Sequence, residues 1–204
     1  MKSEIVILDA GHGGLIGGAY PTPGKRSPAW SRGVLYEGAA NRWIVNEAKR
    51  LLDLRGVPYF DLAPEPTDVP LRERVRRANK IYAEVRNVYV ASIHHNAGGG
   101  TGIEGFTSRG ETRSDAIATS YLTGLEPVVL RFGMRLRYDV KDGDPDKEAA
   151  FYILRKTRPP AILLELGFMD HPHDYELIID PEFAYGRACA ESIAETAARL
   201  YLPV

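Results

Sequence analysis

The sequence predicts a single α/β domain in which a mostly parallel, twisted sheet of about six strands carries helices on both faces. Short runs rich in Val and Ile alternate along the chain with longer segments of helical periodicity. The chain has 204 residues, close to the size of one domain, and 44% of them are hydrophobic, which is enough for a buried core. Strands that alternate with helices in this way pair in parallel through right-handed crossovers.

The expected strands are short and apolar, and they cover residues 5–9, 57–62, 88–93, 103–108, 136–140 and 161–166. The expected helices are longer, and several have a boundary residue such as the Gly that ends the first. They cover residues 37–56, 70–85, 114–133, 144–157 and 181–202, and a break at Gly124 or Pro127 in the third is left open. The irregular, Pro-rich stretch 13–35 has a length typical of functional or mobile loops.

Composition limits the possible functions. The net charge of −1 gives no overall reason to expect nucleic acid as a partner. The single cysteine, Cys189, excludes an internal disulfide and a Cys-rich zinc site, and we interpret it as a core residue. The amino terminus resembles a first strand rather than a signal peptide, and no segment has the roughly 20 apolar residues that cross a bilayer. We therefore expect a protein made in the cytoplasm, without membrane insertion.

Two segments with histidines follow predicted strands. "DAGHGG" places His12 after the first strand, and "SIHHNA" places His94 and His95 at the end of the third. Ligands of open α/β sheets bind beyond the carboxyl ends of strands, so these ends can meet over one crevice if the strands are neighbours. Successive side chains of a strand point to opposite faces, so only one of His94 and His95 can serve a given site. A turn role for His12 stays open, whereas Ile16 at the third glycine position argues against a dinucleotide loop.

Two carboxylates are candidates for chemistry. Glu37 begins the first long helix, where it is either a carboxylate stabilised by the helix dipole or the residue that completes a His, Glu, His ligand set. Three protein ligands with an open fourth position form a catalytic zinc site, although other divalent metals also use such ligands. Glu165 lies within the apolar strand "AILLELGF". It is either a buried Glu paired with an Arg or a proton-transfer group whose pKa is raised by burial.

Other polar segments have simpler interpretations. We interpret "RERVRR" (72–77) as a solvated helix face, in which Arg74 is the residue that could turn inward. "DGDPD" (142–146) has a faint likeness to a calcium loop, but Pro145 interrupts it, and a turn with a helix cap is favoured. His171 and His173 lie in a polar turn and are not expected to be ligands.

Taken together, these segments resemble the zinc-dependent N-acetylmuramoyl-L-alanine amidases of the amidase-3 family. "VILDAGHGG" resembles the family's opening strand, "EGAANRWIVNEAKRLLDLRGV" its first helix, and "LRERVRRAN" its Leu-x-x-Arg-x-x-x-Ala-Asn helix. "VASIHHNA" is similar to its Ser-Ile-His-x-Asn-Ala segment, and "YILRKTRPPAILLELGFMDHPHD" to its closing segment. The likeness covers nearly the whole chain. It departs from the family at His95, and at Asp170 and His171, where the family often has Ser-Asn.

The resemblance implies one catalytic zinc ion held by His12, Glu37 and His94, with Glu165 as the catalytic residue. It makes residues 1–204 an amidase catalytic domain whose partner is peptidoglycan, cleaved between N-acetylmuramic acid and the L-alanine of the stem peptide. Asp9 and Asn96 are candidates for supporting or substrate-binding groups.

The alternatives are a zinc peptidase that acts within the stem peptide, and a wall-binding module that has lost catalysis. The biological setting we expect is phage lysis by a monomeric endolysin that reaches the wall through a holin. A bacterial autolysin of the same chemistry, with an export signal missing from this sequence, is the other possibility.

Overall fold

Six strands form one sheet in the computed structural model, which describes residues 4–139, 141, 143–180 and 182–202. The strands are β1 (Ile5–Ala10), β2 (Tyr59–Asp61), β3 (Val88–Asn96), β4 (Ile103–Thr107), β5 (Lys147–Glu148) and β6 (Ala161–Phe168). Their spatial order is β2-β1-β3-β6-β4-β5, and within it β4 is antiparallel to β6 while the other neighbours are parallel. The prediction of a mostly parallel sheet of about six strands is confirmed.

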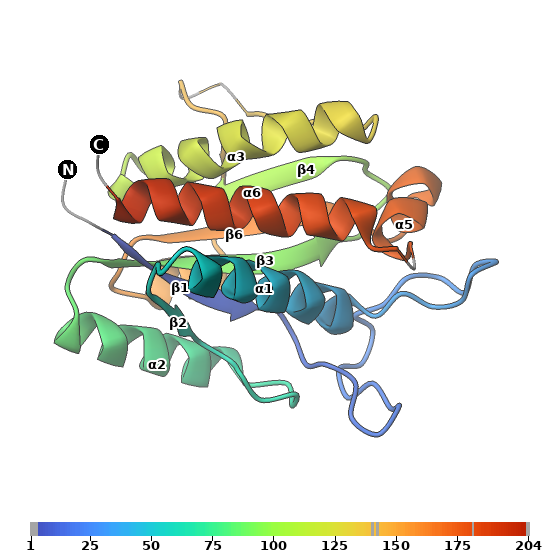
Figure 1. Cartoon of the computed structure of the whole chain (residues 1–204), viewed down its shortest axis with the longest axis horizontal. Helices are drawn as coiled ribbons and strands as arrows, with labels where there is room; N and C mark the ends of the chain where they lie inside the picture. Colours follow the sequence, from blue (N-terminus) through green and yellow to red (C-terminus); the bar gives the residue numbers. More distant parts are fainter. Residues whose placement is uncertain (1–3, 140, 142, 181, 203–204) are drawn as a thin grey trace.

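Helices cover both faces of this sheet (Figure 1). They are α1 (Glu37–Leu54), α2 (Leu71–Glu84), α3 (Arg113–Arg131), α4 (Tyr152–Lys156), α5 (Pro172–Ile178) and α6 (Ala184–Tyr201). The larger apolar core lies between the sheet and α1, α3 and α6, and a smaller one lies under α2 and α4. None of the helices in the described part of the chain is long and apolar enough to cross a bilayer.

The central strand β3 shows how side-chain alternation separates the two cores. Ala91 and Ile93 are buried in the larger core, whereas Val90 is buried in the smaller one. This alternation follows from the two-residue period of a strand. Because of it, the neighbouring residues His94 and His95 point to different sides of the sheet, as the sequence predicts.

The third predicted helix is a single element and has no break at Gly124 or Pro127. Buried Leu125 and Val129 flank the proline and hold both halves of α3 on the core. In the expected strand 136–140, Leu136 forms only an isolated bridge with Ile103, and Val140 lies outside the described residues.

The expected helix over 144–157 is wrong in its first half. Residues Lys147–Glu148 form the edge strand β5, and the helix is only Tyr152–Lys156. Tertiary contacts outweigh the local helix signal here, because Lys147 pairs with Glu104 and Asp146 accepts a hydrogen bond of 2.7 Å from Thr107. The chain also has a short helix, α5, where a polar turn is expected; it begins at Pro172, a residue suited to a first helical position.

Candidate metal centre

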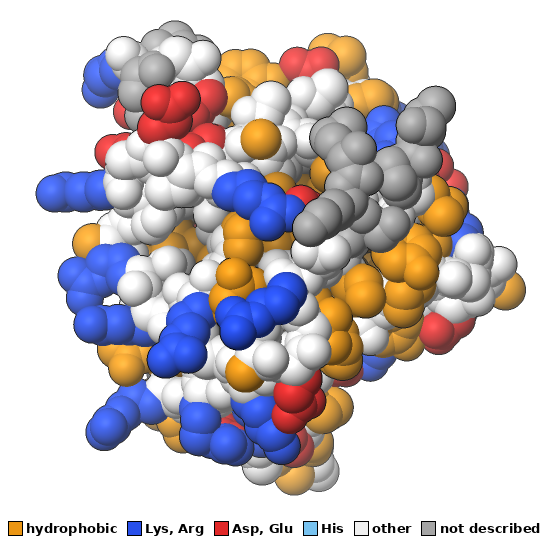
Figure 2. Space-filling view, turned by 90° about the vertical axis from the view of Figure 1, so that its left-hand side faces the viewer, with side chains coloured by type: hydrophobic (Ala, Val, Ile, Leu, Met, Phe, Trp, Pro, Cys, Tyr) orange, Lys and Arg blue, Asp and Glu red, His pale blue; other side chains and the backbone are white. Residues whose placement is uncertain are grey.

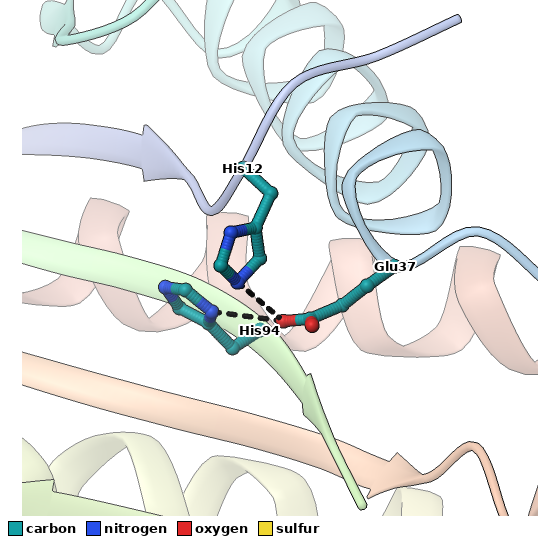
Figure 3. A group of neighbouring side chains, drawn as sticks. All are labelled: His12, Glu37 and His94. Carbon is teal, nitrogen blue, oxygen red and sulfur yellow. Dashed lines mark hydrogen bonds and ion pairs between the residues drawn. The ribbon is translucent and has the colours of Figure 1, made fainter. Parts of the chain in front are cut away.

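Three side chains converge at the carboxyl ends of neighbouring strands (Figure 3). His12 lies in the turn after β1, His94 lies near the end of β3, and Glu37 is the first residue of α1. β1 and β3 are adjacent and parallel, with Asp9 opposite Ser92, so the two strand ends carrying histidines are neighbours. Figure 2 shows the other end of the molecule, where these strands begin; Lys and Arg side chains are spread over much of it.

The donor atoms of this group have the spacing of a metal site. Glu37 Oε1 lies 3.2 Å from His12 Nε2 and 3.0 Å from His94 Nδ1, and one donor atom from each residue lies within 4.8 Å of the others. Two ligands of a tetrahedral zinc ion with bonds of 2.0–2.2 Å are separated by about 3.4 Å. The observed spacing therefore fits one such ion, and two imidazoles with a carboxylate are ligands that zinc accepts.

Glu37 is prepared for this role by its surroundings. It is only 3% exposed, and burial alone would raise its pKa. The hydrogen bonds and charges of His12 and His94 outweigh burial and hold the pKa of Glu37 well below its usual range. The side chain is therefore an ionised carboxylate at neutral pH, the form that binds a cation.

Glu165 lies on β6, directly opposite His94 in the register of the two strands. Burial raises the pKa of Glu165 well above its usual value, and the charges of Glu37 and Glu104 raise it further. Its Oε2 has no hydrogen-bond partner among the described residues, which also contain no ion pair between Glu165 and an arginine. Glu165 lines the cleft and pairs with no arginine among the described residues, so the interpretation as a buried Glu–Arg pair does not hold.

His95 lies behind the site rather than in the group of three. It is 2% exposed, and burial lowers its pKa to about 4, so the ring is neutral. Its Nδ1 is 2.7 Å from Asn41 Oδ1, and Asn41 Nδ2 donates to the Gly11 carbonyl at 3.0 Å. Because the amide group of Asn41 uses its N–H on Gly11, its oxygen must accept, and His95 Nδ1 carries the proton.

The backbone of His12 is held in an unusual conformation. Its φ is 64°, in the left-handed region that few residues other than glycine adopt. The His12 carbonyl accepts hydrogen bonds from Arg42 Nη2 at 3.2 Å and from Arg74 Nη2 at 3.1 Å. Arg74 is itself buried, pairs with Asp9 and donates to the Ala10 carbonyl at 2.7 Å. Arg74 thus turns inward and fixes the end of β1, and Asp9 supports the site through it.

Two glycines in the site mark close approaches. A Cβ on Gly11 would lie 2.2 Å from Cε1 of the His94 ring, and a Cβ on Gly38 would lie 1.9 Å from the Gly13 carbonyl oxygen. Gly11 therefore leaves room for the His94 ring, and Gly38 lets the first turn of α1 pack against the loop that follows His12.

The group opens into a cleft of about 730 Å³. Its walls include Glu165 and Asn96, and on the side of loop 13–35 they include Thr22 and Lys25. The loop is attached to the site, because the Lys25 carbonyl accepts from the Glu37 amide at 3.0 Å. Asn96 donates to Glu104 at 2.7 Å, so it borders the cleft with its amide already engaged.

Two histidines lie outside this group, and two residues that support it had no clear signal in the sequence. His173 Nε2 lies within hydrogen-bonding distance of the Phe132 carbonyl oxygen, at 3.0 Å, and His171 Nδ1 lies 3.3 Å from Asp174 Oδ1. Neither histidine therefore joins the group. Asn41 and Arg42 were not predicted. Asn41 lies one helical turn after Glu37, and that spacing is the only sign in the sequence that both face the same strand ends.

Comparison with known proteins agrees with this arrangement. Residues 6–196 match the amidase-3 family, N-acetylmuramoyl-L-alanine amidase. The chain is 30% identical over 204 residues to the N-acetylmuramoyl-L-alanine amidase CwlM of Bacillus licheniformis, with 96% of this chain and 72% of that protein covered. It is 32% identical over 199 residues to the endolysin of Bacillus phage SPP1, with 95% of this chain and 66% of that protein covered.

A solved structure supports the same assignment. The crystal structure of an N-acetylmuramoyl-L-alanine amidase from Clostridium difficile 630 has a TM-score of 0.73 and 26% sequence identity to this chain, with 97% and 96% of the two chains covered. The chain therefore resembles these proteins both in sequence, over nearly its whole length, and in fold. The chain belongs to the amidase-3 family of N-acetylmuramoyl-L-alanine amidases.

Proposed function

We propose that residues 1–204 form a zinc-dependent catalytic domain that hydrolyses peptidoglycan between N-acetylmuramic acid and the L-alanine of the stem peptide. The observation that carries the proposal is the convergence of His12, Glu37 and His94 at neighbouring strand ends, with Glu165 opposite His94. Two imidazoles and an ionised carboxylate supply three ligands, and the cleft leaves space for substrate beside them.

His12, Glu37 and His94 would hold the zinc ion. When bound, the ion supplies Lewis acidity, which polarises a carbonyl group and makes water easier to deprotonate. The protein's own contribution is to fix the three side chains. The Arg74 contacts fix the end of β1, and the bridge from His95 through Asn41 to Gly11 fixes the turn before His12.

Glu165 would move the proton. As water attacks the lactyl carbonyl carbon, Glu165 Oε2 accepts the proton that the water loses. The same group then donates it to the departing nitrogen as the carbon–nitrogen bond breaks. The products are a muramic acid carboxylate and a stem peptide with a free L-alanine amine. A carboxyl group with a raised pKa suits both steps near neutral pH.

The decisive variant is Glu165→Gln, which keeps the shape of the side chain and removes its basicity. We expect it to bind zinc as the wild type does and to lose turnover on purified sacculi by about 10²- to 10⁴-fold, the usual contribution of general acid–base catalysis. Zinc content is measured by elemental analysis, and release of L-alanine amino groups by amine labelling. Normal digestion of sacculi by this variant would show that the assignment of Glu165 is wrong.

His94 and His95 provide a matched pair of adjacent variants. We expect His94→Ala to lose zinc, because its ring is a proposed ligand. We expect His95→Ala to keep zinc when the metal is saturating, with an affinity lowered by about tenfold at most, because its ring contacts Asn41 and acts only through the bridge to Gly11. Loss of zinc from the second variant alone would reverse the ligand assignment.

Product analysis separates the other candidate functions. An amidase frees L-alanine amines and makes no new reducing sugar ends, whereas a stem-peptide peptidase exposes other amino groups. A wall-binding module would bind sacculi and release nothing. The three ligand candidates together with Glu165 argue against the wall-binding module, and the match to the amidase-3 family favours the amidase over the peptidase.

We propose phage lysis as the biological setting, with the protein acting as a monomer. The likeness to the endolysin of Bacillus phage SPP1 supports this setting, while the likeness to CwlM of Bacillus licheniformis supports the alternative of a bacterial autolysin. Expression inside a sensitive host, with and without a co-expressed holin, distinguishes them. An endolysin lyses the host only when the holin opens the membrane.

A further inference from the structure

A second group of carboxylates lies at the other end of the sheet. Asp115 is in the first turn of α3, and Asp144 and Asp146 precede β5. One carboxylate oxygen from each of the three lies within 4.8 Å of the others. Thr107, the last residue of β4, stands beside them and pairs with Glu148 of β5. Because β4 runs antiparallel to β6, this place is far from the carboxyl ends that carry His12 and His94.

The hydrogen bonds of this group leave carboxylate oxygens unused. Asp115 uses Oδ2 to accept from the Thr112 amide in a capping box. Asp144 Oδ1 accepts from the Asp146 amide at 3.3 Å, and Asp146 Oδ2 accepts from Thr107 Oγ1 at 2.7 Å. Among the described residues, no N–H or O–H group donates to the second oxygen of any of the three.

Asp146 is the observation that points to a ligand. Its side chain lines the cavity between these residues and is only 2% exposed, yet its Oδ1 has no hydrogen-bond partner among the described residues. An unpaired buried carboxylate oxygen is unfavourable unless a proton or a cation compensates it. A bound cation would compensate this oxygen.

No cationic side chain of the described segment fills that role. Lys147 pairs with Glu104, and Arg113 pairs with Glu4. The cavity, of about 220 Å³, is lined instead by two further acidic residues, Glu111 and Glu148. Burial, then the charge and the side-chain hydrogen bond of Asp144 and the charge of Asp115, raise the pKa of Asp146 to about 7. The carboxylates thus repel one another in a partly buried space, which a divalent cation would relieve.

We propose that Asp115, Asp144 and Asp146 form a Ca²⁺ site that is separate from the catalytic centre. The ligands are all oxygens, which hard cations prefer, and the group contains no imidazole or thiolate that would favour zinc. Ca²⁺ accepts carboxylate oxygens in flexible geometry, whereas Mg²⁺ demands near-ideal octahedral geometry and usually keeps several waters. Carboxylate oxygens that all lie within 4.8 Å of one another are close enough to bind one Ca²⁺ together.

The site would join three segments of the chain. The ion would tie the end of β4, the start of α3 and the segment before β5 to one another. The chain continues from β5 to Phe151 and Tyr152, which line the catalytic cleft. Calcium would thereby stabilise the edge of the sheet from which one wall of the cleft is built.

Calorimetric titration of the zinc-loaded full chain with CaCl₂ tests the proposal. We expect one Ca²⁺ per chain with a Kd between about 10⁻⁵ and 10⁻³ M. Asp144→Asn and Asp146→Asn should weaken binding at least about tenfold, as expected when a charged ligand is lost. Asp139→Asn is the matched control: it removes an Asp from the same segment, one that faces Lys141 at 3.7 Å, and should bind as the wild type does.

Thermal unfolding gives a second readout. Calcium should raise the Tm of the wild type and of Asp139→Asn, and leave that of Asp146→Asn unchanged. Circular dichroism confirms that each variant is folded, and the more exposed Asp144→Asn serves if Asp146→Asn does not fold. The proposal is overturned if the folded wild type binds no Ca²⁺ up to about 10 mM, beyond the weakest usual sites. It is also overturned if Mg²⁺ binds more tightly, or if Asp146→Asn raises the Tm and calcium has no effect on the wild type.

Discussion

Substitution of Gly11 by alanine is the sharpest test of how the backbone positions the proposed metal centre. The added Cβ would lie 2.2 Å from His94 Cε1 and 2.5 Å from the ring atoms Nδ1 and Nε2. Ordinary van der Waals contact begins at 3.4 Å, so the imidazole must move by about 1 Å. Gly11 does not have a positive φ, so alanine adds no backbone strain. Any loss therefore reports on the displaced ring.

A shift of about 1 Å in a metal ligand is expected to reduce zinc affinity or turnover by about 10- to 100-fold, equivalent to about 1.4–2.8 kcal/mol. Zinc affinity is measured by competition with a chromophoric chelator, and turnover by amine release from sacculi. Gly105→Ala is the control, because its Cβ would press on Leu122 at 3.0 Å in the core, away from the site. Wild-type zinc affinity and turnover in Gly11→Ala would refute this account of the packing.

Three further predictions concern the same site, each measured on metal-free or metal-titrated protein. Because burial raises the pKa of Glu165, its contribution to stability is present below pH 4.5 and is lost as pH rises toward the higher folded value. We therefore expect the free energy of unfolding, measured in urea at a series of pH values, to fall with rising pH more steeply in the wild type than in Glu165→Gln. The difference in slope should be at most about 1.4 kcal/mol per pH unit, and parallel pH profiles of the two proteins would contradict this. Because His12 has a φ of 64°, metal-free His12→Gly should be more stable than His12→Ala by about 1 kcal/mol, and the reverse order in urea unfolding would count against strain at this position. Asn41→Ala should weaken zinc binding by about 10-fold, because it breaks the bridge between His95 and the Gly11 carbonyl, and unchanged affinity in the chelator competition would show that the bridge does not position the ligands.

Strand rules predict that His12 can meet one of His94 and His95, whereas the choice of His94, and of Glu37 as a ligand, follows from the resemblance to the amidase-3 family. The carboxyl ends of neighbouring parallel strands meet at one edge of a sheet, and the two-residue period of a strand separates His94 from His95. The first rule applies only if β1 and β3 are neighbours, and the structure shows that they are. One donor atom from each of the three residues lies within 4.8 Å of the others.

The parts that could not be predicted depend on contacts between residues far apart in the sequence. The segment 144–157 has a good helix start, but Lys147 is drawn to Glu104 and Asp146 to Thr107, so the chain forms an edge strand instead. The segment 72–77 indicates that Arg74 could turn inward, but its partner could not be predicted; the pairing with Asp9 at the end of β1 explains why Arg74 is buried.

Two adjacent residues of β3, His94 and His95, both affect the proposed metal site. The alternation of side chains along the strand directs His94 to Glu37 and His95 to Asn41. Asn41 in turn holds the carbonyl of Gly11, the residue that precedes His12. The two histidines therefore act on the same site from opposite faces, one as a proposed ligand and the other through the backbone next to a second ligand. A change at His95 should accordingly alter the position of His12 more than that of His94, although His94 is its neighbour in sequence.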